Sequence, residues 1–194
     1  PYRRQRQMCI RDSINIPSSV NDFGNLVFDG CPIKSATIPS LAIEYLGKEV
    51  LEHVVINAGV NIGNDAFNYC DSLISITLPA SISKIGDYAF NGCTSLEAVY
   101  ISDIEAWCKI SFGSGLTNSN PLAYAHNLYL DGKLLTELII PNGITEIKNA
   151  AFDGCKSIVS VIISDSVTSI GYGAFRDCSN LESINIPENI TIIG

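Results

Sequence analysis

An aromatic residue three positions before a cysteine recurs along this chain of 194 residues. Cys70 and Cys93 are 23 residues apart, and so are Cys155 and Cys178. A fixed period in the twenties is typical of a solenoid, in which each repeat is one coil that stacks on its neighbours. No other feature constrains the architecture as strongly. The five pairs are Phe28 and Cys31, Phe67 and Cys70, Phe90 and Cys93, Phe152 and Cys155, and Phe175 and Cys178.

Each repeat opens with alternating apolar residues, as in 73–78, followed in most copies by a proline such as Pro79. Alternation with a period of two predicts a short strand, and the proline ends it because proline has no N–H group to donate. The next segment, such as 81–92, has apolar residues at helix-like spacing, but its glycines limit it to a turn or so of helix. Since one coil cannot bury these side chains alone, we expect identical residues of successive coils to pack in columns.

Two stretches break the period. Cys31 and Cys70 are 39 residues apart, so we expect a loop or short helix around 42–50, before a strand over 51–56. A longer insertion is expected at about 102–134. Ser102 and Glu105 match a capping box there, which predicts a short helix. The apolar face of this helix would consist of Ile104, Trp107, Cys108 and Ile110.

The second half of the longer insertion contains Asp131-Gly132, the strongest short hairpin signal in a sequence. It predicts a turn between strands at 127–130 and 133–138. The insertion has two interpretations. It is either an elaboration of the packing or a ligand-binding element, since long loops often carry function.

The pattern I-G-x-x-A-F-x-x-C at 85–93 and 170–178 resembles the BspA-type leucine-rich repeats of bacterial and some protist surface proteins. The resemblance covers nearly all of 14–194. It implies an α/β repeat solenoid, a right-handed superhelix with one parallel β-sheet, short helical turns opposite and a helix-plus-hairpin insertion. It also implies a secreted or cell-surface protein that adheres to host matrix proteins, other bacteria or glycans. The fold alone does not fix the function.

Residues 1–13 hold four of the chain's twelve cations and no position of the repeat. A basic arm of this kind is typical of binding to nucleic acid or an anionic surface. However, 4–13 resembles translated sequencing-adapter read-through, so we interpret 1–13 as a non-native leader. The last copy of the repeat, from Leu181, stops halfway. We therefore expect a single solenoid over 14–194 that is truncated at its C-terminus.

The chain is acidic, with a net charge of −8 and 16% charged residues. We expect no unaided binding to nucleic acid or to an anionic membrane, because both need clustered cations that neutralise phosphate. No run of about eighteen apolar residues is present, so the sequence predicts no membrane-spanning segment.

Catalytic and metal-binding chemistry finds little support. The cysteines recur at one coil position instead of in C-x-x-C pairs, which favours buried thiols in the core over a metal site. A disulfide between adjacent coils is the alternative, since the compartment of such proteins can be oxidising. His53 and His126 lie in no nucleophile or metal motif, and carboxylates such as Asp153 fall at variable polar positions where solvent exposure is expected. We predict no enzyme activity and no cofactor.

Strand alternation predicts which side chains point away from the core. Because adjacent strands lie about 4.8 Å apart, these residues would form one row. The row has two interpretations: β-branched residues simply suit a sheet surface, or the row is a patch for a partner with Tyr100 as its anchor. Its members are Thr37, Val55, Thr77, Tyr100, Ile139, Ile162 and Asn185, and a neighbouring row consists of His53, Ser75, Ala98, Glu137, Ser160 and Ser183.

The leading functional hypothesis is a non-catalytic adhesion or protein-interaction module that binds a protein or glycan through the solenoid face. The alternatives are a structural spacer within a larger surface protein and an accessory domain of an enzyme. Neither the identity of the ligand nor the oligomeric state follows from the residues.

Overall fold

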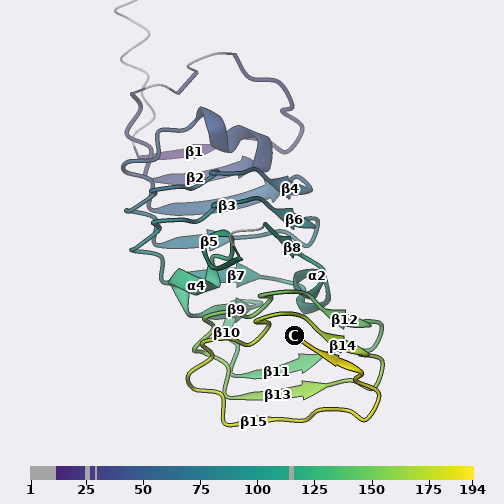
Figure 1. The fold of residues 1–194 in the computed structure, drawn as a ribbon. Coiled ribbons are helices and arrows are strands. Elements are labelled where there is room, and N and C mark those ends of the chain that lie inside the picture. The colour runs from purple at the N-terminus through teal and green to yellow at the C-terminus, as the bar shows by residue number, and fades with distance from the viewer. Residues whose placement is uncertain (1–11, 25–26, 29, 114–115) are drawn as a thin grey trace, which may run out of the picture.

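The computed structural model describes residues 12–24, 27–28, 30–113 and 116–194. The chain winds into a stack of coils, with the first strands at one end and β15 at the other (Figure 1). Each regular coil adds one strand to a sheet along one side of the stack. These strands are β1 (Ser13–Asn15), β2 (Ser35–Pro39), β3 (His53–Ala58), β5 (Ser75–Thr77), β7 (Ala98–Ile101), β11 (Glu137–Ile140), β13 (Ser160–Ile163) and β15 (Ser183–Ile184).

The sheet implied by the repeat is divided in two at the longer insertion. Here β9 (Leu128–Leu130) pairs in parallel with β7, and β10 (Lys133–Leu134) pairs antiparallel with β9. The resulting seven-stranded sheet has the order β1-β2-β3-β5-β7-β9-β10, and β11-β13-β15 form a separate three-stranded sheet. The expectation of one parallel sheet is therefore wrong, because the antiparallel strand β10 ends the first sheet.

A second, smaller ladder occupies the place where short helical turns were expected. The expected turn of helix in 81–92 is wrong, because Tyr88 and Gly92 adopt left-handed φ angles of 55° and 76°, which a right-handed helix does not accommodate. Backbone groups bond between coils instead, as the Phe67 N–H does to the carbonyl of Ala89 at 2.7 Å. The two-residue strands are β4 (Asn61–Ile62), β6 (Lys84–Ile85) and β8 (Ser111–Phe112) in one sheet, and β12 (Glu146–Ile147), β14 (Ser169–Ile170) and β16 (Ile192–Ile193) in another.

The core consists of columns, as the repeat predicted. Phe67 and Phe90 are fully buried and stack with ring centroids 5.1 Å apart, and Phe152 stacks on Phe175 at 5.5 Å. The inward residues of neighbouring strands stay in register, so that Ile76 of β5 pairs with Val99 of β7. Stability therefore depends on contacts between successive coils, as in other repeat proteins.

A glycine in one coil makes room for a polar side chain of the coil before it. A Cβ atom on Gly86 would lie 2.3 Å from Asn64 Oδ1, and one on Gly171 would lie 2.5 Å from Asn149 Oδ1. These asparagines are fixed because each accepts a backbone hydrogen bond from the later coil, at 2.9 Å from the Asp87 N–H and at 2.8 Å from the Tyr172 N–H. Real Cβ atoms essentially never approach so closely, so these positions require glycine.

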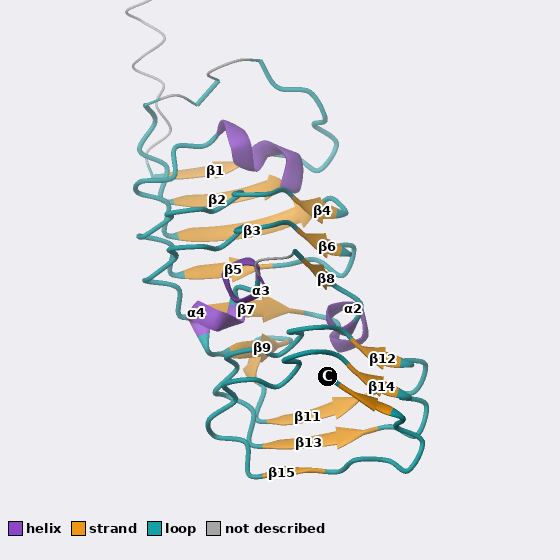
Figure 2. Ribbon diagram, in the orientation of Figure 1, coloured by secondary structure: helices purple, strands orange, loops and turns teal. Residues whose placement is uncertain are grey.

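The helical segments of the described residues lie in the two stretches that break the period (Figure 2). None of them is long and apolar enough to cross a membrane. They are the 3-10 helix η2 (Ser40–Tyr45), α2 (Ile104–Cys108), α3 (Leu116–Ser119) and α4 (Leu122–Ala125).

Most of the expected leader, residues 1–11, lies outside the described residues. Its last two residues take part in the first described coil. The carbonyl of Asp12 accepts hydrogen bonds from the N–H groups of Lys34 and Ser35 at 2.9 Å each, and Ser13 begins β1.

Candidate partner-binding face

The register of the first sheet brings four of the predicted outward residues together. Thr37 pairs with Val55, Val55 with Thr77, and Thr77 with Tyr100. The residues next to them in the strands, such as Val54 and Ile76, are buried, so the period of two separates core from surface as predicted. These side chains form one row across the strands.

The row does not continue from Tyr100 to Ile139. Tyr129 of β9 pairs with Tyr100, and the two rings stack with centroids 4.7 Å apart and planes at 28°. Leu134 of β10 pairs with Tyr129 in turn and is exposed. The prediction of one continuous row was wrong, because it passed over the strand that the insertion adds. Alternation within Leu128 to Leu130 is the signal that identifies Tyr129.

The remaining predicted residues lie in the second sheet. Ile139 pairs with Ile162, and their side chains are 55% and 45% exposed. Asn185 follows β15 and is exposed, but its amide group is engaged with the neighbouring coil. Its Oδ1 accepts from the Ile163 N–H at 2.6 Å, and its Nδ2 donates to the Ile163 carbonyl at 3.2 Å. Asn185 therefore links two coils.

The neighbouring row of the first sheet is polar and small. His53 Nδ1 and Ser75 Oγ are 2.9 Å apart, within hydrogen-bond distance, and Ser75 pairs with Ala98 in the register. At the start of β2 and β3, Lys34 Nζ and Glu52 Oε1 form an ion pair of 2.6 Å, and this hydrogen bond raises the pKa of Lys34. The face thus combines an apolar row with a row of hydrogen-bonding side chains.

The longer insertion packs into the stack as a modified coil. The indole Nε1 of buried Trp107 donates to the carbonyl of Ala151 at 2.9 Å, which joins α2 to the next coil. The carbonyl of Asn118 accepts from the Phe90 N–H at 3.0 Å, in the place that the Ala89 carbonyl takes for Phe67. This arrangement favours the packing interpretation of the insertion.

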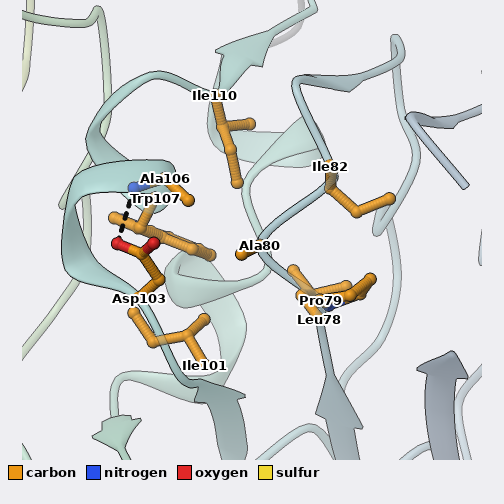
Figure 3. Close-up of a pocket in the computed structure, with 9 residues that line it drawn as sticks. All are labelled: Leu78, Pro79, Ala80, Ile82, Ile101, Asp103, Ala106, Trp107 and Ile110. Atoms are coloured by element: carbon orange, nitrogen blue, oxygen red, sulfur yellow. Dashed lines mark hydrogen bonds between the residues drawn. The ribbon is translucent and has the colours of Figure 1, made fainter. Parts of the chain in front are cut away.

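Figure 3 shows the small cavity between α2 and the segment from Leu78 to Ile82, with Trp107 and Ile110 on its wall. Its volume is about 10 Å³, too little for more than one water molecule. The helix cap differs from the prediction. Asp103 and not Ser102 is the N-cap residue, and its Oδ1 accepts from the Ala106 N–H at 3.0 Å.

The repeated cysteines are thiols inside the stack. Burial raises the pKa of Cys70 to about 11 and that of Cys178 to about 12. The Cys93 thiol donates to the carbonyl of Phe67, and the Cys178 thiol to that of Phe152, each at 3.1 Å. High pKa values and engaged S–H groups are typical of inert structural cysteines.

One carboxylate departs from its expected exposure. Asp153 is 1% exposed, and both of its carboxylate oxygens accept from the Arg176 guanidinium, with Nε to Oδ1 at 3.0 Å. The hydrogen bonds from Asp153 raise the pKa of Arg176. His126 Nδ1 lies 2.9 Å from the carbonyl of Gly154. Within the part of the chain that the structure describes, no three His, Cys, Asp or Glu side chains are placed to hold a metal ion.

Several solved structures are similar to this chain. They include a leucine rich repeat protein of T. pallidum, with 24% identity over 93% of this chain and 82% of that chain and a TM-score of 0.43. A leucine rich cell surface protein from Faecalibacterium prausnitzii A2-165 has 20% identity over 93% of this chain and 70% of its own, with a TM-score of 0.35. The pneumococcal vaccine antigen PcpA has 18% identity over 92% of this chain and 51% of its own, with a TM-score of 0.38.

Sequence comparison provides the assignment. Curated protein sequences contain no match to this chain. The profile of the BspA type leucine rich repeat region matches in six copies, over 7–58, 60–114 and 125–194. These segments make up most of the sequence and include both copies of I-G-x-x-A-F-x-x-C. The chain therefore belongs to the BspA-type leucine-rich repeat family.

Proposed function

We propose that this chain is a non-catalytic interaction module of a secreted or cell-surface protein, and that it binds a protein or glycan partner through the outward face of its sheets. The location outside the cell follows from the resemblance to BspA-type surface proteins. The binding role rests on one observation: apolar and aromatic side chains are exposed on strand positions that point away from the core.

The exposed side chains are large enough to anchor a partner. Val55 is 39% exposed and Leu134 44%, in addition to Ile139 and Ile162 of the second sheet. Tyr100 and Tyr129 present a stacked aromatic pair between Val55 and Leu134. Tyrosine buries a large area with little loss of conformational entropy and is enriched among the residues that dominate binding energy. The polar row beside it supplies hydrogen-bonding groups that orient a ligand.

The test is a double variant, Tyr100→Ser with Ile162→Ser, which removes one anchor from each sheet. A matched control is Tyr69→Ser with Val159→Ser, since both of these residues are exposed and lie outside the row. Wild type and variants are compared for binding to a panel of purified matrix proteins and to a glycan array. We expect the first variant to lose roughly tenfold or more in affinity for any bound ligand, and the control to lose little.

A structural spacer gives the opposite result. If wild type binds nothing on either panel, or if the two double variants bind equally well, the face is an ordinary sheet surface. The β-branched residues would then reflect only the preference of pleated strands for such side chains.

A further inference from the structure

The small ladder β4-β6-β8 has an open edge at β4. In later coils, two N–H groups donate to the coil before. Ser83 donates to the carbonyl of Val60 at 2.8 Å and Gly86 to that of Ile62 at 2.9 Å, and Thr168 and Gly171 repeat this pattern. Val60 and Gly63 hold these positions in the β4 coil, but neither N–H bonds to another described residue. The preceding coil forms η2 here, so no strand lies beside β4 on this side.

Gly63 points to a ligand at this edge. Its counterparts Gly86 and Gly171 are crowded by Asn64 and Asn149 of the preceding coils. A Cβ atom on Gly63 would meet nothing within 4 Å, and its φ lies outside the left-handed region that favours glycine. The described chain therefore gives no reason for glycine at this position. A segment that takes the place of a preceding coil would supply that reason.

The open edge lies in a groove of about 610 Å³ between β4 and η2. This volume is within the range of sites that take small ligands or short peptide segments. Leu41 of η2 and Val60 line opposite walls, and both are exposed, at 42% and 57%. Glu44 and Asp65 are also in the lining, with Lys48, whose Nζ donates to the Asp65 carbonyl at 3.0 Å. Two carboxylates against one ammonium favour a neutral or basic occupant.

We propose that this groove binds an extended peptide segment of a partner protein, which adds to β4 as a further strand. Its carbonyl groups accept hydrogen bonds from the Val60 and Gly63 N–H groups, as in other cases of strand addition. An Asn or Asp side chain of the peptide lies against Gly63, as Asn64 lies against Gly86. Its apolar side chains contact Leu41 and Val60. The site shares no residue with the sheet face, so the two proposals stand independently.

The probe is a capped heptapeptide with the sequence of residues 143–149, Gly-Ile-Thr-Glu-Ile-Lys-Asn. In the intact chain this segment accepts hydrogen bonds from Thr168 and Gly171 and places Asn149 against Gly171. The ¹⁵N-labelled full chain is titrated with the peptide and followed by NMR. We expect saturable shifts of the Val60 and Gly63 amide signals and slower hydrogen exchange at both. A peptide with alanine in place of its final asparagine should bind more weakly.

The decisive variant is Gly63→Ala. Because the added methyl group enters open space, the urea midpoint of unfolding should not change, yet the methyl group should collide with a bound peptide and weaken binding by roughly tenfold or more. Gly24→Ala is the matched control, since a Cβ atom there also meets nothing within 4 Å. It should change neither stability nor binding.

Three results overturn the proposal. The first is the absence of amide shifts at millimolar peptide. The second is equal peptide affinity of Gly63→Ala and wild type. The third is protection of the Val60 and Gly63 amides from exchange before peptide is added, which would mean that a second copy or another part of the chain already fills the groove.

Discussion

Replacement of Asn120 by alanine tests whether the longer insertion holds the two sheets of the stack together. Asn120 is fully buried. Its Nδ2 donates to the carbonyl of Ala150 at 2.6 Å, and its Oδ1 accepts from the Leu122 N–H at 2.9 Å. Asn120→Ala leaves both backbone groups buried without these partners. Each unsatisfied group costs about 1–3 kcal/mol, so we expect a loss of about 2–6 kcal/mol in the free energy of unfolding.

The assay is urea unfolding followed by the fluorescence of Trp107 and by far-UV circular dichroism. Trp107 is a suitable reporter because it donates to Ala151, next to the carbonyl that Asn120 contacts. The matched control is Asn127→Ala. The Asn127 amide also donates to a backbone carbonyl, that of Glu97 at 3.1 Å, but this contact is exposed to solvent, so the control should cost no more than about 0.5 kcal/mol.

Equal losses in the two variants would refute the reasoning. The buried amide would then contribute no more than a surface amide, and the insertion would be attached to the following coil by other contacts. A large loss seen by circular dichroism but not by Trp107 fluorescence would also contradict the argument, because it would place the damage away from α2.

Two further predictions concern the columns of the core. Phe90→Ala should cost about 3–5 kcal/mol in urea unfolding, because a fully buried ring that stacks on Phe67 is removed, whereas Phe175→Ala should cost less because Phe175 is only half-buried; similar losses would argue against burial as the cause. Since burial raises the pKa of Cys70 to about 11, the folded chain keeps this proton at pH values where an unfolded thiol, with a pKa of about 8.5, loses it. The contribution of the neutral thiol to stability is therefore complete below about pH 8.5 and declines as the pH rises towards 11. Unfolding measured at pH 8 and pH 10 should show a smaller decline in Cys70→Ala than in wild type, and an unchanged pH dependence would contradict the assignment.

The sequence predicted those features that one spacing controls. Phe67 and Phe90 are 23 residues apart, and a solenoid with that period must place them in one column. The small ladder was not foreseen, because strands of two residues such as Lys84–Ile85 are too short to show alternation. Their pairing is set by the adjacent coil and not by local sequence. The repeat period fixes that neighbour, but not the conformation of the segment.

The errors at the candidate site have a similar cause. Tyr129 was missed because the row was extended from one regular coil to the next across an insertion that contributes a strand of its own. Asp153 was expected in solvent, although Arg176 stands 23 residues later, directly above it in the stack. Opposite charges one period apart are therefore a usable signal for a buried pair in a repeat of this kind.

The adjacent pair Gly86-Asp87 serves both neighbours of its coil. Gly86 accommodates Asn64 of the coil before, and Asp87 Oδ1 lies against Gly113 of the coil after. Gly63-Asn64 has the same composition. A coil that carries such a dipeptide brings with it everything that both of its junctions need. Duplication of a single 23-residue block in the gene would thus give a protein that is longer by one coil, without compensating changes elsewhere.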